Sequence, residues 1–419
     1  MAELLNVDDV VARIVRGMQP LPDETVPLID ALQRVLAQDV VAPADVPSFA
    51  SSSMDGYAVR AGDTSDASPE TPVRLRVVAD IPAGVAPHVT LGAGEAARIM
   101  TGAPVPEGAD AIVPVEGTGE TWRSDGSSRL AETVEVFQAV KPGDYVRPPG
   151  ENLRAGEHVL EQGTVLRPQD IGILASLGLA EVPVYRRPRV AIISTGSELV
   201  EAGQPLAPGQ IYNSNGPMLA ALVRSAGGEA IVLPTAPDTL DAVRGCFDAA
   251  LQSAPDLILS SAGVSVGTHD VVRTVVEELG AIDLWRVNVR PGKPLVYGHV
   301  RGIPYFGLPG NPVSAMVTFD LFVRPALDRL QGARQAAPPE IVAVLGEAFE
   351  SDGRRSYLRV RLERSGDRWV AYSTGTQSSA ALLSMVRADG LLILPEGVRH
   401  APAGSQFPVR LLRPLALPG

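Results

Sequence analysis

The sequence predicts a multidomain protein that combines an α/β domain with all-β regions. The chain has 419 residues, more than one ordinary domain needs, so roughly two to four domains are expected. Hydrophobic residues make up 45% and charged residues 20%, a balance that supports sizeable cores. From Arg189 onward strand and helix patterns alternate, whereas short strand-like runs dominate before and after this part.

The charge balance and the cysteine content exclude several classes of protein. Acidic residues outnumber basic ones by 48 to 36, so the formal net charge is −12. This excess argues against non-specific binding to nucleic acid or a membrane surface, which requires a basic face. Cys246 is the only cysteine, so no disulfide forms within the chain. The start lacks a basic n-region, and no stretch approaches the roughly 18 apolar residues of a membrane span. We expect a soluble, cytoplasmic protein.

The regions flanking an early β-rich segment predict helices. Asn6 is a plausible cap for a helix over residues 7–18, and apolar spacing predicts a second helix over 28–36. Helix returns at 170–177, where Gly178 ends it. We expect residues 1–44 and 148–187 to form a discontinuous helical linker domain.

Residues 45–147 predict an inserted β domain. Runs with β propensity at 73–78, 97–100 and 111–115 are separated by segments rich in proline and glycine. Two turn-like segments stand out here, one containing Asp55 and one containing Thr101. Either can be explained as an ordinary turn.

Residues 188–332 predict a doubly wound, mostly parallel α/β domain. Strands are expected at 190–193, 230–233, 257–259, 284–289 and 303–306, and helices at 217–226, 240–251, 271–279 and after 312. Such alternation places helices on both faces of a sheet and binding sites beyond the carboxyl ends of its strands. After a linker rich in alanine and proline, residues 333–419 predict a small β domain with strands at 341–345, 357–362, 369–372, 391–394 and 407–412.

Three loops after expected strands of the α/β domain predict an anion site. They are Ser260–Asp270, Arg290–Pro294 and Gly307–Ser314, each rich in glycine, proline or small hydroxyls. Such loops let the backbone approach a ligand closely, and Arg290 and Lys293 supply positive charge.

Each of these motifs also has a purely structural explanation. Asp270 stands at a helix start, where it can cap the helix, hold Mg²⁺ or orient a water. Asn311-Pro312 is a strong helix start. Ser194–Glu198 follows the first strand but lacks the G-x-G-x-x-G spacing of dinucleotide sites. The histidines show no metal-ligand spacing, and neither a nucleophile elbow nor a G-x-x-x-x-G-K-[ST] phosphate loop is present.

Taken together and in this order, the motifs resemble the molybdopterin molybdenumtransferase (MoeA) family, which is related to the C-terminal domain of gephyrin. They are Ser53-Met-Asp-Gly-Tyr-Ala58, Arg98-Ile-Met-Thr-Gly-Ala-Pro104, Ser194-Thr-Gly-Ser-Glu-Leu199, Gly263-Val-Ser-Val-Gly267, Arg290-Pro-Gly-Lys-Pro294, Gly307-Leu-Pro-Gly-Asn-Pro-Val-Ser314, Tyr357-Leu-Arg359 and Gly375-Thr-Gln-Ser-Ser379. The resemblance covers nearly the whole chain.

The resemblance implies a MogA-like α/β domain, a C-terminal β-barrel and the last step of molybdenum-cofactor synthesis. In that step molybdate enters the dithiolene of adenylylated molybdopterin and AMP is released with the help of Mg²⁺. It further implies a homodimer whose site combines the α/β domain of one subunit with the inserted β domain of the other. A molybdopterin adenylyltransferase and apo-molybdoenzymes are possible partners.

The resemblance also assigns roles to residues. It implies catalytic roles for Asp270, which would hold Mg²⁺, and for Lys293, Asp55, Thr101 and Glu198. It implies contacts to the pterin, AMP or molybdate from Gly263, Ser265, Gly267, Thr195, Gly196, Arg290, Pro309, Asn311, Pro312, Ser314, Arg359 and Ser378.

The chain departs from the family pattern at a few positions. Asn152 and Thr235 stand where the family usually has aspartates, and Asp389 stands where it usually has asparagine. Two other functions fit parts of the sequence: a non-catalytic scaffold that binds the pterin, and a nucleotide hydrolase that shares only the α/β domain.

Overall fold

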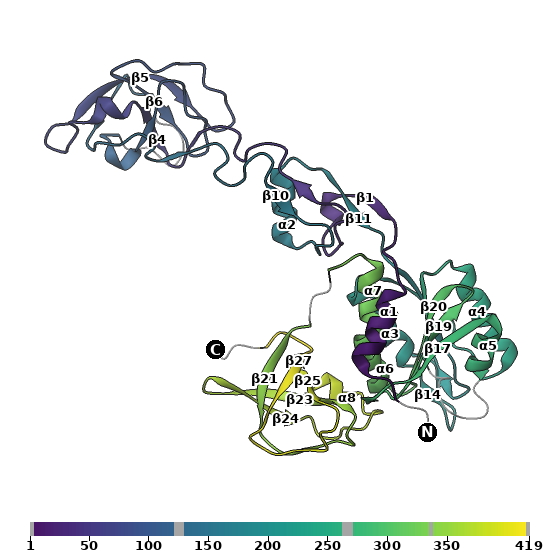
Figure 1. Ribbon diagram of the computed structural model, residues 1–419. Coiled ribbons are helices and arrows are strands. Elements are labelled where there is room, and N and C mark those ends of the chain that lie inside the picture. Colours follow the sequence, from purple (N-terminus) through teal and green to yellow (C-terminus); the bar gives the residue numbers. More distant parts are fainter. Residues whose placement is uncertain (1–3, 121–129, 262–270, 335–337, 416–419) are drawn as a thin grey trace. The chain divides into compact units, whose positions relative to one another are not determined.

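The computed structural model describes residues 4–120, 130–261, 271–334 and 338–415 (Figure 1). The chain divides into two compact units. One comprises Met1–Gln38, Gly163–Arg167 and Glu181–Gly419, and the other comprises Asp39–Gln162 and Pro168–Ala180. No helix in these ranges is long and apolar enough to cross a membrane.

The smaller unit is built around a five-stranded sheet in the order β7-β4-β6-β5-β8. Its elements are β2 (Val40–Val41), β3 (Ser51–Ser52), β4 (Gly56–Val59), η2 (Ala61–Thr64), β5 (Val73–Ile81), β6 (Glu95–Ile99), β7 (Ala111–Pro114), η3 (Val115–Gly117), β8 (Thr133–Val136), β9 (Val146–Arg147), β10 (His158–Leu160) and α2 (Pro168–Ser176). The three predicted runs of the inserted region are strands here, and α2 ends just before Gly178, whose φ is +78°.

The larger unit begins with α1 (Val7–Arg16), β1 (Asp23–Pro27) and η1 (Leu28–Asp30). The side chain of Asn6 accepts a hydrogen bond from the amide of Asp8 (2.8 Å), which confirms the predicted cap. The predicted helix over 28–36 is wrong. Gln33 has a left-handed φ of 59°, and Val35 and Leu36 instead form β-bridges to Val165 and Val184. Long-range pairing therefore overrides the local helical spacing.

The α/β domain contains a six-stranded sheet in the order β15-β12-β16-β20-β19-β17. Its elements are β11 (Glu181–Tyr185), β12 (Arg189–Ser194), β13 (Leu199–Val200), β14 (Ile211–Tyr212), α3 (Asn215–Ser225), β15 (Glu229–Val232), α4 (Leu240–Gln252), β16 (Leu257–Ser261), α5 (Val271–Leu279), β17 (Gly280–Arg286), β18 (Val289–Arg290), β19 (Pro294–Val300), β20 (Ile303–Leu308), α6 (Pro312–Thr318), the π-helical turn η4 (Phe319–Val323) and α7 (Arg324–Leu330). Strand β11 pairs with β1 outside this sheet.

Helices cover both faces of this sheet, as a doubly wound fold requires. Val190 and Ile192 of β12 belong to one buried cluster with side chains of α1, α3, α6 and α7. Their neighbours Ala191 and Ile193 belong to another cluster with side chains of α4 and α5. Successive residues of a strand point to opposite faces, so two cores form on one sheet.

The sheet is mixed rather than wholly parallel. Strands β15, β12, β16 and β20 pair in parallel, but β19, which the sequence did not predict, is antiparallel to both β20 and β17. The predicted strand over 284–289 is wrong in its bounds. Strand β17 ends at Arg286, and β18 leaves the sheet to pair with strand β23 (Arg355–Ser365) of the C-terminal region.

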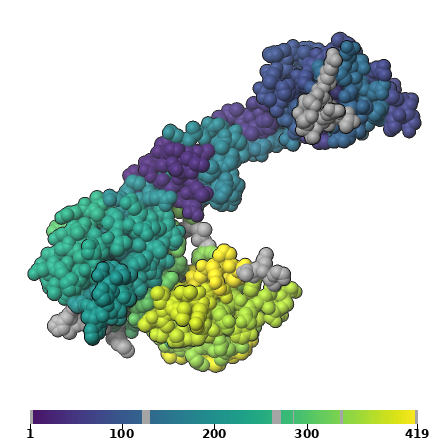
Figure 2. Space-filling model, turned by 180° about the vertical axis from the view of Figure 1, so that it is seen from behind, coloured from purple at the N-terminus to yellow at the C-terminus, as the bar shows by residue number. Residues whose placement is uncertain are grey.

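The C-terminal region forms a closed barrel. Strands β23 (Arg355–Ser365), β24 (Arg368–Ser373), β21 (Glu340–Leu345), β27 (Gln406–Leu411) and β25 (Gly390–Leu394) follow one another, and β25 pairs back to β23. The remaining elements are β22 (Phe349–Glu350), α8 (Leu383–Val386) and β26 (His400–Ala401). Figure 2 shows the barrel (yellow-green) beside the α/β domain (teal). The β18–β23 pairing joins the two.

Candidate functional site

A cavity of about 460 Å³ lies between the α/β domain and the barrel. It is lined by Arg290, Pro291, Gly292, Lys293, Pro294, Pro309, Asn311, Ser314, Arg354, Leu358, Arg359, Gln377, Ser378 and Ser379. The structure therefore brings together many of the predicted site residues: Arg290, Lys293, Pro309, Asn311, Ser314, Arg359 and Ser378. Their loops come from both the sheet edge and the barrel.

The loop that carries Arg290 and Lys293 is placed by the sheet. Since β17 and β20 are both antiparallel to β19, they run in the same direction and end at the same edge. Gly292 has a φ of +111°, and a Cβ there would lie 2.4 Å from Cγ2 of Thr318. Only glycine therefore lets this loop lie against α6.

The segment before α6 connects the two halves of the cavity. Asn311 occupies the N-cap position, but its side chain makes no capping hydrogen bond. Instead its amide donates to Oγ of Ser379 (2.9 Å), and the amide of Val313 donates to the carbonyl of Ser379 (3.1 Å). Pro312 takes the first helical position as predicted, and Ser314 is buried in the first turn.

Arg359 is the most informative residue of the cavity, because it is buried and has no acidic partner among the described residues. It is 1% exposed. Its Nε donates to Oγ of Ser384 (3.1 Å) and its Nη2 to the carbonyl of Ser378 (3.1 Å), and it enters no ion pair within the described ranges. Burial, and then the like charge of Arg290, lower the pKa of Arg359 to about 10. The described part of the site is therefore short of negative charge.

The other cations of the cavity differ in how they are neutralised. Arg354 pairs with Asp352 and donates to the carbonyl of Val289 (2.8 Å). The hydrogen bond from Arg354 lowers the pKa of the Asp352 carboxyl. Arg290 is half-buried and Lys293 is exposed, and neither joins an ion pair with a residue that the structure describes. Asp352 attracts Arg290 without pairing with it, so the described residues Arg290, Lys293 and Arg359 together leave a net positive field that an anion can occupy.

A second polar region lies at the carboxyl end of β12 and the start of α3. Oγ of Ser194, Oγ1 of Thr195 and Oδ1 of Asn215 are buried and find no hydrogen-bond partner among the described residues. The amide of Asn215 donates to Oγ of Ser261 and to the carbonyl of Gly310, both at 2.7 Å. Because buried polar groups are normally satisfied, these atoms favour a polar ligand here.

Of the predicted residues, Thr195, Gly196 and Glu198 lie in this second region and do not line the cavity. Thr195 and Gly196 are buried, and Glu198 is exposed. A Cβ at Gly196 would lie 2.9 Å from both carboxylate oxygens of Glu198, so glycine permits this close approach.

Asp55 and Thr101 lie together in the smaller unit. Oδ1 of Asp55 accepts hydrogen bonds from the amide (2.7 Å) and the hydroxyl (2.8 Å) of Thr101, and both residues are exposed. Gly263, Ser265, Gly267 and Asp270 lie outside the described residues. Within the described ranges, no group of three or more His, Cys, Asp or Glu residues could hold a metal ion.

Some lining residues were not predicted. Gln377 and Ser379 lie inside the Gly375–Ser379 motif, which could have indicated them. Arg354, and Asn215 of the second polar region, had no such signal, because their positions depend on strand pairing and on loops far away in the chain.

The fold and the cavity define a protein with a cation-lined cavity between the edge of an α/β sheet and a β-barrel, suited to an anionic ligand. Three family models match the chain: the MoeA N-terminal region (domain I and II) over residues 5–178, a probable molybdopterin binding domain over 191–329, and the MoeA C-terminal region (domain IV) over 342–412.

Full-length relatives agree with these matches. Molybdopterin molybdenumtransferase 2 of Mycobacterium tuberculosis is 44% identical over 407 residues, which cover 96% of this chain and 97% of the relative. The Nostoc molybdopterin molybdenumtransferase is 38% identical over 412 residues, 96% of this chain and 92% of its own. A molybdopterin biosynthesis MoeA protein from Pyrococcus horikosii superposes with a TM-score of 0.81 at 34% identity, covering 99% of this chain and 100% of its own. The chain belongs to the molybdopterin molybdenumtransferase family, a family of transferases, and the predicted resemblance is confirmed.

Proposed function

We propose that this protein inserts molybdate into adenylylated molybdopterin and releases AMP. The observation that carries the proposal is the cavity in which Arg290, Lys293 and Arg359 meet without acidic partners among the described residues. Molybdate and phosphate are tetrahedral oxyanions, and both suit such a cluster of fixed cations.

The proposed reaction balances without an added reductant or oxidant. Water cleaves a P–O bond of the phosphoanhydride, which leaves AMP and the pterin's own phosphate. The two dithiolene sulfurs bind molybdenum, and one oxo ligand departs as water with the two thiol protons, so molybdenum stays hexavalent. Arg359 and Lys293 would hold the oxyanion during this exchange, and Ser314 and Ser378 would donate hydrogen bonds to its oxygens.

The adenylylated pterin would occupy the second polar region. The hydroxyls of Ser194 and Thr195, which find no partner among the described residues, can donate to phosphate oxygens beside Gly196. Oδ1 of Asn215 and the carboxylate of Glu198 are oxygen donors of the kind that Mg²⁺ binds. With Asp270 they would hold this ion, which neutralises charge on the phosphoanhydride when it is bound.

Reconstitution tests the function directly. The purified protein is incubated with adenylylated molybdopterin, Mg²⁺ and molybdate, and AMP is measured. We expect AMP release that depends on molybdate and on Mg²⁺. Pterin that stays bound without AMP release would support the alternative, a non-catalytic molybdopterin-binding scaffold. In Asp270→Ala we expect pterin binding without AMP release.

We further propose a homodimer in which Asp55 and Thr101 reach the site of the partner subunit. Mixing Lys293→Ala and Asp55→Ala proteins, at a molybdate concentration at which neither is active alone, tests this arrangement. Random reassociation should restore about a quarter of the sites, because each mixed dimer contains one site with no substituted residue. Activity that stays at zero after mixing would contradict the shared site. In this role the protein would act in the cytoplasm, between a molybdopterin adenylyltransferase and apo-molybdoenzymes.

A further inference from the structure

The two halves of the anion cavity come from two different domains. The α/β domain contributes Arg290, Lys293 and Ser314, and the barrel contributes Arg359 and Ser378. Oxyanion binding, as proposed above, therefore depends on how firmly these domains are held together. The following inference rests on that proposed function.

Around the cavity, Arg290 and Arg359 repel each other across the domain boundary, although Asp352 on the barrel side attracts Arg290. Arg290 lies on the α/β side and Arg359 on the barrel side, and the electrostatic effect of one on the other is unfavourable. Without an anion, like charges across a boundary oppose its closure. The contacts that join the domains beside the cavity include the two-residue β18–β23 pairing, the hydrogen bond from Arg354 to the carbonyl of Val289, and the hydrogen bonds of Asn311 and Val313 to Ser379.

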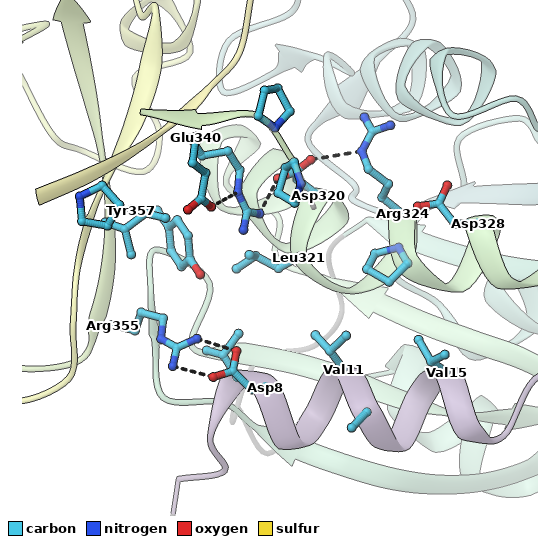
Figure 3. Close-up of a pocket in the computed structure, with 18 of the residues that line it drawn as sticks. Asp8, Val11, Val15, Asp320, Leu321, Arg324, Asp328, Glu340, Arg355 and Tyr357 are labelled. Carbon is cyan, nitrogen blue, oxygen red and sulfur yellow. Dashed lines mark hydrogen bonds and ion pairs between the residues drawn. The ribbon is translucent and has the colours of Figure 1, made fainter. Parts of the chain in front are cut away.

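Opposite charges meet across a second part of the same boundary. There a groove of about 1220 Å³ separates α1, η4 and α7 from the barrel (Figure 3). Asp320 of η4 accepts from Nη1 of Arg410 of β27 (2.9 Å). Asp8 of α1 accepts two hydrogen bonds from Arg355 of β23 (2.7 and 2.8 Å), and Figure 3 shows this pair at one end of the groove.

These two pairs differ in burial and therefore in expected strength. The side chains of Arg410 and Asp320 are 16% and 23% exposed, whereas that of Asp8 is 73% exposed. A shielded pair resists water and salt better than an exposed one. The Asp320–Arg410 pair should contribute more.

Strand β23 links the groove to the cavity. Arg355 pairs with Val289, the next residue, Ser356, pairs with Arg290, and Arg359 follows on the same strand. A shift of β23 at Arg355 therefore changes the pairing of Arg290 and the position of Arg359, which are both cations of the cavity.

We propose that the Asp320–Arg410 and Asp8–Arg355 ion pairs are positioning pairs that hold the two halves of the anion cavity together against the repulsion of its cations. Neither pair lines the cavity or touches the anion. Their effect passes through β23 and through the continuous helical segment of α6 and η4. They should therefore change the affinity for the oxyanion and leave the chemical step unaltered.

Direct binding of molybdate to the full-length protein, measured by equilibrium dialysis, tests this role. We expect Asp320→Asn to raise the Kd about five- to tenfold and Asp8→Asn about two- to threefold, in keeping with the burial of each pair. In the AMP-release assay, KM for molybdate should rise by the same factors while kcat stays within about twofold, because only ground-state assembly of the site has changed.

Matched controls separate positioning from general stability. Asp256→Asn removes a pair with Arg186 (2.7 Å; Asp256 14% exposed) that lies away from this boundary, so it should lower stability without changing Kd. Asp9→Asn alters an exposed carboxylate on the same helix as Asp8 and should change neither. If Asp320→Asn does not fold, the Kd of Asp8→Asn still tests the positioning role.

Three results would overturn the inference: a Kd for Asp320→Asn and Asp8→Asn equal to that of the wild type, an equal rise in Kd for Asp256→Asn, or a fall in kcat with KM unchanged. A wild-type protein that binds no molybdate would instead overturn the proposed function and, with it, this inference.

Discussion

Arg359 and Arg410 are both largely buried arginines of the same barrel, but the charges around them differ. Arg410 pairs with Asp320 and Glu340 and lies over the ring of Tyr357, 5.7 Å from its centroid. Arg359 has only hydroxyl and carbonyl acceptors among the described residues. Burial would lower the pKa of both, but the carboxylates reverse the direction for Arg410, whose pKa is raised.

The contrast teaches how to separate a structural cation from a binding one. Removal of a buried charge that has a carboxylate partner destabilises the fold, because it leaves the partner charge unpaired. A buried charge without a partner is a cost to folding that a ligand can repay. Its presence in a cavity therefore indicates an anion. The groove and the cavity, on two parts of one domain boundary, represent these two cases.

The sharpest way to break the comparison is Arg359→Met. We expect molybdate affinity to fall by about 10²–10³, the cost of removing a positioned oxyanion donor. The unfolding free energy should fall by less than about 1 kcal/mol, because no ion pair is lost. Equilibrium dialysis and urea denaturation measure the two effects. An unchanged affinity would show that Arg359 is not part of the binding site.

The reciprocal change is Arg410→Met. Here we expect the unfolding free energy to fall by about 2–4 kcal/mol, because Asp320 loses a partner in a shielded position. Molybdate affinity should fall less than about tenfold. Urea denaturation and dialysis of the same samples give both numbers. A stability equal to that of Arg359→Met would remove the distinction between the two arginines.

Lys293 sharpens the comparison from the exposed side of the cavity. Lys293→Ala should weaken molybdate binding about 10- to 100-fold and leave stability within about 0.5 kcal/mol, as for other exposed changes. The chain's other lysine, Lys141, is exposed and lies in the smaller unit, so Lys141→Ala is a matched control. Amine-reactive labelling followed by mass spectrometry should show molybdate protecting Lys293 but not Lys141. A loss well below tenfold would make Lys293 peripheral.

The smallest expected effect concerns pH at the groove. The hydrogen bond from Arg355 lowers the pKa of Asp8 below its ordinary 3.8. A lowered carboxyl pKa contributes stability above the ordinary value and loses it as pH falls through the folded-state value. Because Asp8 is exposed, wild type and Asp8→Asn should differ by about 0.5 kcal/mol at pH 7 and converge well below pH 3.8. Denaturation curves across this range test the sign, and a difference that grows on acidification would contradict it.

Much of the fold followed from local patterns. The strands and helices of the α/β domain and the barrel strands lie close to their predicted positions, because each has its own period of apolar residues. The failures share one cause. Residues 28–36 and 284–289 had plausible local patterns, but their backbones pair with distant segments, Val184 in one case and Arg355 in the other. No window of sequence contains such pairing.

The sequence predicted which residue types form the site, but it did not predict how their charges are paired. Glycine and proline at Gly292 and Pro309 marked loops that approach a ligand, and Arg290 and Lys293 supplied recognisable charge. Among the described residues Arg359 has no carboxylate partner, and a sequence does not reveal which carboxylates lie near a given arginine. Likewise the Asp8–Arg355 pair joins residues 347 positions apart, so the groove had no local signal.

The two-residue pairing of β18 with β23 limits how the domains of this protein can be separated or exchanged. Val289 and Arg290 belong to the α/β domain in sequence, but they pair with strand β23 of the C-terminal barrel. The C-terminal domain therefore cannot be exchanged between relatives as an independent unit. In a chimera between relatives, folding would depend on the match between β18 and β23 more than on the packing of either hydrophobic core. A chimera should therefore take both strands from the same parent.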